Sequence, residues 1–347
     1  MKRIIFDEGH EFNTPHPERK ATFHDFAIIA SRLGIQRIWT SGSQPPHLRP
    51  MFCKNVFLDK KSLEIRASTV RPELSYQVLP IDTSSLGVSS FTALIRLVAH
   101  LKKTLAERDR IMVFFKNNSL AETFAEKTHC AVYHSKLPIS GNTKDYNLFR
   151  WDSGDTKVLA ATTAVAQGIH RGYVKHVIFF EGAYGAISFY QGAGRAGRQG
   201  EPSFVFIVYD TRVVQCVRDG WKSVKDTSCD SAFVALSKNF TFCRTEMLSS
   251  IMDGDKLSKK CTSIPGCNLC DVCDPDSEMA LLARYAIKTP PPPPTALKVV
   301  TPPSLPITVS GESEDGMFEF MEITSSVARE LDSIANTELK KVWISVE

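Results

Sequence analysis

Apolar and polar residues alternate in two distinct patterns along the first 210 residues. Short apolar runs of the kind that form buried strands lie at Arg3–Phe6 and Gln36–Thr40. Between these runs, apolar residues recur at helical spacing over 18–33, namely Phe23, Phe26, Ala27, Ala30 and Leu33. The pattern predicts a strand, an amphipathic helix and a second strand in the first 40 residues.

The alternation continues from residue 77 to residue 210. The expected helices lie at 91–107 and 119–127. The expected strands lie at 110–115, 157–162 and 174–180, with a short further strand leading into 132–135. Strands that alternate with helices predict an α/β fold, in which a parallel sheet is covered by helices on both faces.

The composition changes twice beyond residue 210. Residues 211–288 predict a smaller helical region and carry most of the cysteines. Five consecutive prolines follow within Thr289–Thr295 and predict an extended linker. We therefore divide the chain at 1–75, 76–210, 211–288 and 289–347, and expect the last part to be largely disordered apart from a possible helix over 318–339.

The charge distribution and the positions of the cysteines indicate what kind of partner and what kind of metal site the chain could have. The formal net charge of +4 is the sum of an acidic tail, 301–347, with nine acids and three bases, and a basic body. A basic body suits a polyanionic partner, although surface lysines are common. Five of the nine cysteines fall between 243 and 273, a cluster typical of metal binding in a reducing compartment. We therefore expect an intracellular protein.

Residues 190–198 read Tyr-Gln-Gly-Ala-Gly-Arg-Ala-Gly-Arg and carry the strongest chemical signal. Arginine supplies a permanent charge and a planar fork of donors suited to phosphate oxygens, and glycine permits close backbone approach. Their spacing predicts that Arg195 and Arg198 share one turn at the start of a helix and face a triphosphate. The alternative is a glycine-rich surface turn with solvated arginines.

This segment resembles motif VI of superfamily-two helicases, and of the RecQ family of DNA helicases in particular. Two upstream segments resemble other motifs of that family: 113–118 resembles motif IV, and 160–170 resembles motif V. The resemblance implies phosphate contacts to nucleic acid from Lys116, Asn117, Thr162 and Thr163. It also implies nucleotide binding by Gly168, Gly194, Arg195 and Arg198, and a catalytic role for Gln191. His170 occupies the place of the family's aspartate.

Asp7-Glu8-Gly9-His10 resembles helicase motif II, and Ser41-Gly42-Ser43 resembles motif III. By this resemblance Asp7 holds Mg²⁺ through water, and Glu8 orients or deprotonates the attacking water. His10 would link the nucleotide site to the second lobe. A solvated acidic turn is the alternative for four such residues taken alone.

The Gly-x-x-x-x-Gly-Lys-[Ser/Thr] loop that cradles ATP phosphates does not occur in the 347 residues. We expect a chain truncated at its start, with a partial first lobe whose strand edges lack partners. Such a remnant is expected to fold poorly alone. The expected fold class is an α/β RecA-like parallel sheet lobe, preceded by that partial lobe and followed by a helical zinc-binding subdomain.

The cysteine cluster resembles the zinc-binding subdomain of RecQ proteins. Tetrahedral Zn²⁺ takes four thiolates, and Cys-x-x-Cys loops bring sulfur atoms within bonding range. The expected ligands are Cys243, Cys267, Cys270 and Cys273, with Cys261 as a possible substitute. Buried structural cysteines are the alternative. A closed site of four thiolates predicts a structural metal.

The resemblance implies an ATP-dependent 3′–5′ DNA helicase of the nucleus, with ATP·Mg²⁺ and Zn²⁺ as cofactors. Its partner would be single-stranded or forked DNA, and the proline-rich tail could bind a protein. The alternative is a non-catalytic, zinc-stabilised DNA-binding or interaction protein derived from a helicase. An RNA helicase is a third reading, against which the zinc cluster argues.

Overall fold

The computed structural model describes residues 3–13, 20–59, 62–137, 143–162, 173–212, 229–290 and 342–345. All of them belong to one of the chain's two compact units, which comprises residues 1–291 and 340–347. The expected helix over 318–339 lies outside the described residues. Across the described ranges, none of the helices combines the length and the apolar character needed to cross a membrane.

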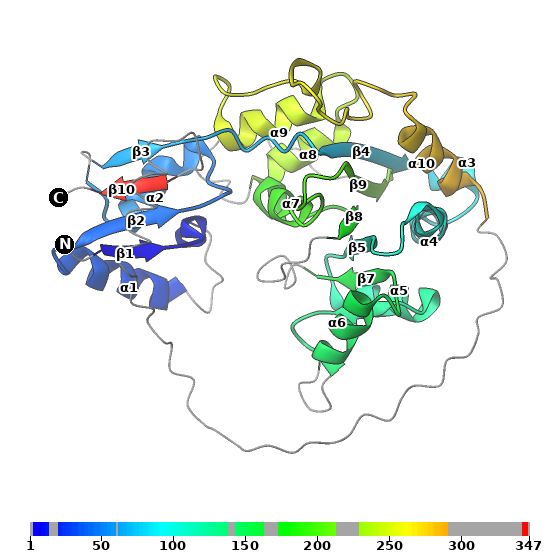
Figure 1. Ribbon diagram of the computed structural model, residues 1–347, viewed down its shortest axis with the longest axis horizontal. Helices are drawn as coiled ribbons and strands as arrows, with labels where there is room; N and C mark the ends of the chain where they lie inside the picture. The colour runs from blue at the N-terminus through cyan, green and yellow to red at the C-terminus, as the bar shows by residue number, and fades with distance from the viewer. Residues whose placement is uncertain are drawn as a thin grey trace. The chain divides into compact units, whose positions relative to one another are not determined.

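A small sheet forms from the first part of the chain and its last described residues (Figure 1). Its order is β1 (Arg3–Phe6), β2 (Gln36–Thr40), β10 (Val342–Ser345) and β3 (Leu63–Ile65). Strands β1 and β2 are parallel, and β10 runs antiparallel to both β2 and β3. Strand β2 is therefore paired on both sides, with β1 and with β10, whereas the sequence predicts an unpaired edge.

Aromatic packing forms the core of this part. Trp39 of β2 is fully buried and stacks on Phe6 with a centroid distance of 4.0 Å. Phe52 packs against Trp39 edge to face from α2 (Arg49–Asn55). The expected helix is present as α1 (Lys20–Arg32), but its predicted apolar face is only partly buried: Ala27 and Ala30 are buried, whereas Phe26 and Leu33 are exposed.

The second sheet has six parallel strands, as the alternating sequence predicts. Its order is β4 (Leu74–Ile81), β9 (Ser203–Asp210), β8 (Val174–Phe180), β5 (Arg110–Phe114), β7 (Val158–Ala161) and β6 (Ala131–Tyr133). Because the central strands are buried on both faces, they are nearly continuous apolar runs.

Two apolar clusters cover the two faces of this sheet. On one face lie α4 (Ser90–Leu101), α5 (Asn118–Thr128) and α10 (Glu278–Lys288), and Figure 1 shows α4 and α10 side by side. Helix α4 is capped by the preceding Ser89, whose hydroxyl accepts from the backbone N–H of Thr92 at 3.1 Å. It ends at Leu101, and a 3-10 turn over Lys102–Thr104 replaces the expected last helical turn.

The other face carries α6 (Thr143–Ser153), α7 (Gly185–Ala193), α8 (Asp230–Lys238) and α9 (Arg244–Asp253). Gly192 of α7 lies so close to the sheet that a Cβ atom would come within 2.7 Å of the Phe179 ring. Glycine therefore lets the helix of the motif VI segment pack tightly on β8. The remaining short helix is α3 (Thr83–Leu86), and other 3-10 turns span Gly9–Phe12, Pro46–Leu48 and Cys261–Ser263.

Candidate functional site

The acidic segment follows the end of β1. Asp7 Oδ1 accepts hydrogen bonds from Thr40 Oγ1 and from the backbone N–H of Glu8, both at 2.8 Å. Glu8 has φ 52° and ψ 41°, a left-handed conformation that is rare for a residue with a side chain. Two adjacent carboxylates at a strand end fit a hard cation such as Mg²⁺.

His10 connects three segments that are far apart in the sequence. Its Nδ1 lies 3.0 Å from Ser41 Oγ and 3.3 Å from Ser43 Oγ. Its Nε2 lies 2.6 Å from Nε2 of Gln191, which also donates to Ser43 Oγ at 3.1 Å. The structure therefore brings the segments that resemble motifs II, III and VI into direct contact.

Burial sets the protonation state of this contact. His10 is 3% exposed, and desolvation lowers its pKa to about 4. The ring is consequently neutral near pH 7, so one ring nitrogen donates and the other accepts. This matches a ring whose Nε2 accepts from the Gln191 amide and whose Nδ1 donates to a serine hydroxyl.

The arginine pair lies in a different place from the one that the spacing predicts. Arg195 and Arg198 follow the C-terminal end of α7 and precede β9, and no helix begins at them. Gly197 has φ +62° and Gly200 has φ +82°, and this left-handed backbone cannot continue a helix. The prediction of a helix start was therefore wrong. The two arginines lie in successive turns: the Arg195 N–H donates to the Gly192 carbonyl at 3.1 Å, and the turn around Arg198 closes from the Gly200 N–H to the Gly197 carbonyl at 3.0 Å.

Arg195 and Glu8 interact electrostatically, although they come from different segments. Burial, the negative charge of Asp7 and that of Glu11 raise the pKa of Glu8, and the positive charge of Arg195 lowers it. Burial lowers the pKa of Arg195 to about 10, which leaves its guanidinium charged near neutral pH. The charges of Glu8 and Arg195 thus act on one another across the two segments, and a phosphate–metal ligand would carry charges complementary to both.

The described residues expected to contact nucleic acid lie at the carboxyl ends of two neighbouring strands in the six-stranded sheet. Lys116 and Asn117 follow β5, and Thr162 follows the neighbouring parallel strand β7. The Asn117 side chain caps α5 by accepting from the Leu120 N–H at 2.8 Å. Thr163, Gly168 and His170 lie outside the described residues. The carboxyl ends of parallel strands are a common ligand-binding edge in α/β folds.

Four cysteine sulfur atoms gather in the third part of the chain. Cys243, Cys261, Cys270 and Cys273 each offer a sulfur atom, and all four atoms lie within 4.8 Å of one another. The Sγ atoms of Cys243 and Cys261 are 3.5 Å apart, and those of Cys261 and Cys270 are 4.0 Å apart. Tetrahedral Zn²⁺ with bonds of about 2.3 Å sets neighbouring sulfurs about 3.8 Å apart, so the donor set fits zinc.

Cys267 is not part of this group of four. The sequence favours it as a ligand and treats Cys261 as a substitute, but the structure groups Cys261 with the other three. Burial raises the pKa of the Cys267 thiol to about 11. The long segment between Cys243 and Cys267, which prompts the substitute in the sequence, is the signal that identifies Cys261.

Arg244 and Asp271 support the cysteine group, and sequence reasoning missed both. Arg244 is fully buried, and its Nε and Nη2 bind the two carboxylate oxygens of Asp271 at 2.5 and 3.0 Å. The same carboxylate accepts from the backbone N–H of Val78 in β4 at 2.8 Å. The sequence signal for this ion pair is an arginine directly after one cysteine and an aspartate between two others.

The six-stranded sheet and its covering helices have the RecA-like architecture that the sequence predicts. Residues 90–200 match the family described as "Helicase conserved C-terminal domain". In the solved structures, the chain has a TM-score of 0.51 to "S. cerevisiae Dbp5 bound to RNA and ADP BeF3", at 15% identity, over 83% of this chain and 64% of that one. At that identity the likeness shows the fold alone.

Several curated proteins similar to the chain are helicases of the RecQ type. The chain is 25% identical over 272 residues to the RecQ-like DNA helicase BLM of Xenopus laevis, covering 72% of this chain and 19% of that protein. It is 22% identical over 284 residues to the ATP-dependent helicase SGS1 of Saccharomyces cerevisiae, covering 75% of this chain and 18% of that protein. The chain is therefore similar to RecQ-type helicases, and it spans under a fifth of the length of these two proteins.

Proposed function

We propose that this chain supplies the second lobe and part of the first lobe of an ATP-dependent DNA helicase of RecQ type that moves 3′–5′. The contact of His10 with Ser43 and Gln191 carries the proposal. It joins the acidic segment to the helix that precedes the arginine pair. Movement at one side of this contact would reach the other, which is the requirement for coupling hydrolysis to motion.

The chain's own residues fit one end of a nucleotide site. Bound Mg²⁺ would neutralise phosphate charge and sit on Asp7 through water. Glu8 would orient or deprotonate the attacking water, because its raised pKa brings it closer to the working pH of a base. Arg195 and Arg198 would stabilise charge on the terminal phosphate, with Gly194 and Gly168 allowing close approach.

Single-stranded or forked DNA is the proposed macromolecular partner, and the nucleus is the proposed location. Lys116, Asn117, Thr162 and Thr163 would contact phosphates at the carboxyl edge of the sheet. The Xenopus laevis relative is described as a RecQ-like DNA helicase, and the basic body of the chain suits a polyanion. Such contacts predict binding that is sensitive to salt and largely independent of base sequence.

Zn²⁺ is the proposed structural cofactor of the cysteine group. Its four sulfurs would close the coordination shell, so that no position remains for a reacting water. Arg244 and Asp271 would then fix the metal loop to β4.

The second candidate is a zinc-stabilised DNA-binding protein without ATP turnover. The observation that favours it is the sequence itself, because the 347 residues contain no phosphate-cradling loop. For this polypeptide alone we therefore expect DNA binding without hydrolysis, and helicase activity only together with a segment that bears such a loop.

ATP hydrolysis and DNA binding of the same purified chain separate these candidates. Hydrolysis that single-stranded DNA stimulates, and that Glu8→Gln and Arg195→Ala each abolish, supports turnover by this polypeptide and eliminates the second candidate. Salt-dependent DNA binding with no hydrolysis supports the second candidate for these 347 residues. A chain that shows no hydrolysis and no DNA binding would contradict both candidates.

A further inference from the structure

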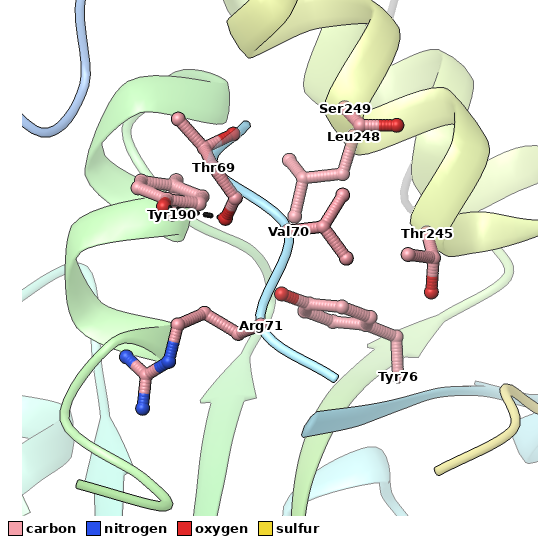
Figure 2. A pocket seen from close by; sticks show the side chains of 8 residues that line it. All are labelled: Thr69, Val70, Arg71, Tyr76, Tyr190, Thr245, Leu248 and Ser249. Atoms are coloured by element: carbon pink, nitrogen blue, oxygen red, sulfur yellow. Dashed lines mark hydrogen bonds between the residues drawn. The ribbon is translucent and has the colours of Figure 1, made fainter. Parts of the chain in front are cut away.

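The segment Thr69–Glu73 connects the two sheets and touches both candidate sites. The Tyr190 hydroxyl of α7 donates to the Thr69 carbonyl at 2.8 Å, and the Thr69 N–H donates to Asp253 Oδ2 of α9 at 2.7 Å. Figure 2 shows the segment running between the helix of Tyr190 (α7) and that of Leu248 and Ser249 (α9). Together these elements line a small cavity of about 10 Å³. The backbone of Thr69 is thus held by two helices at once.

Arg71 extends from this segment to the turn that carries the arginine pair. Its Nη2 donates to the Ala196 carbonyl at 3.2 Å and to the Gly197 carbonyl at 3.0 Å. Its Nε pairs with Glu73. Both carbonyls lie between Arg195 and Arg198 in the sequence, so one guanidinium group binds the backbone of the turn.

The turn also packs closely against Glu73. A Cβ atom at Gly197 would lie 2.8 Å from Glu73 Cγ, and Gly197 itself has φ +62°. A hollow of about 450 Å³ opens beside these groups, lined by Arg71, Glu73, Arg198 and three glycines of the turn. The turn is therefore packed closely at Gly197 against Glu73, while the rest of it borders the hollow.

The cysteine loop holds the same segment from its other end. The Asn268 N–H donates to the Pro72 carbonyl at 2.7 Å, and the Asn268 side chain donates to the Glu73 carbonyl at 3.4 Å. Asn268 lies between Cys267 and Cys270 of the cysteine cluster. Hydrogen bonds therefore fix the backbone of the segment on both sides of Arg71.

We propose that Arg71 is a positioning residue for the arginine turn, defined as Gly194–Gly200, and that α9 holds Arg71 in place through Asp253. The functional meaning of this inference rests on the proposed function, because it concerns the arginines expected to meet phosphate. The geometry itself does not depend on turnover. A guanidinium fork is required because one planar group has to reach two carbonyls and Glu73.

Hydrogen exchange of the full chain, without nucleotide or DNA, tests the proposal. In Arg71→Ala we expect the amides of 194–200 to exchange about tenfold faster or more, because hydrogen bonds from a charged donor are lost. Arg71→Lys keeps the charge but not the fork, and should restore part of the protection. Asp253→Ala should speed exchange in the same peptide, and Asp253→Asn, which keeps an acceptor oxygen, should do so much less.

Arg49→Ala is the matched control, because Arg49 pairs with Glu64 beside the small sheet. It should leave exchange at 194–200 unchanged. Unchanged exchange there in Arg71→Ala overturns the proposal. Equal acceleration in the strands β5 and β9 also overturns it, because Arg71 would then support the whole lobe rather than the turn. A wild-type chain that neither binds DNA nor hydrolyses ATP would count against the proposed function and would leave this test intact.

Discussion

His10 and His176 are both buried imidazoles, but their surroundings give them different roles. His10 hydrogen-bonds Ser41, Ser43 and Gln191. His176 in β8 is fully buried between Phe204 and Phe206, and neither ring nitrogen has a hydrogen-bond partner among the described residues. The first imidazole connects segments of the candidate site, whereas the second fills the core of the sheet.

Replacing His176 should reduce the acid sensitivity of the protein. Burial lowers its pKa to about 3, so the folded state keeps it neutral while the unfolded state binds a proton below about pH 6.5. Its contribution to stability is therefore full above pH 6.5 and is lost as the pH falls toward 3. Between pH 8 and pH 5, wild type should lose about 2 kcal/mol through this group, and His176→Phe should not.

Urea unfolding at both pH values measures this difference. Any packing effect of the larger ring acts at both pH values and cancels in the comparison. The control is His24→Gln, since His24 is exposed, and it should follow wild type. An equal loss of stability in wild type and His176→Phe would contradict the assignment of His176 as a buried neutral imidazole.

Elements of the second lobe could be predicted well because their signals are local. The strand expected over 174–180 has the same bounds in the structure, and the strand expected over 110–115 differs by one residue. Apolar runs flanked by turn residues need no knowledge of distant contacts. The arginine pair was misplaced because Gly194 ends the preceding helix, and its spacing alone does not tell a helix start from a helix end.

The sequence predicts which residues belong to the candidate site better than it predicts the contacts between them. Asp7, His10, Gln191 and Arg195 are all expected from the sequence. The roles of Arg71 and Asp253 are not, because they depend on how a connecting segment passes between two helices. The choice between Cys261 and Cys267 is of the same kind, since it depends on the path of the loop that follows α9.

Zinc analysis of two cysteine variants tests the grouping of sulfur atoms. Cys261→Ser removes one of the four gathered ligands and should lower bound zinc well below the expected one equivalent and destabilise the protein. Cys267→Ser removes a neighbouring sulfur outside the group and should keep the metal. Zinc retained in Cys261→Ser but lost in Cys267→Ser would restore the ligand set favoured by the sequence.

At the scale of the whole molecule, one strand of each sheet receives a partner from a distant part of the chain. Strand β4 lies at one edge of the six-stranded sheet, and the cysteine loop bonds to it: the Asp271 N–H donates to the Tyr76 carbonyl at 3.1 Å. Strand β10 fills the space between β2 and β3 in the small sheet. An unpaired edge invites aggregation, so both contacts protect the molecule as well as shape it.

The proposed nucleic-acid interface of the six-stranded lobe lies where the strands of its sheet end, at their carboxyl ends. Lys116 lies at these ends, and the exposed Lys103 precedes the same strand, β5, on its amino-end side. Lys116→Ala should therefore weaken DNA binding, whereas Lys103→Ala is the matched control of equal charge change.

Fluorescence anisotropy with labelled single-stranded DNA, repeated over a range of salt concentrations, tests this claim most directly. We predict that Lys116→Ala lowers the steepness of log K against log salt by about 0.7 to 1, for DNA of any sequence, and that Lys103→Ala matches wild type. Equal slopes for wild type and Lys116→Ala, or a loss confined to Lys103→Ala, would contradict it.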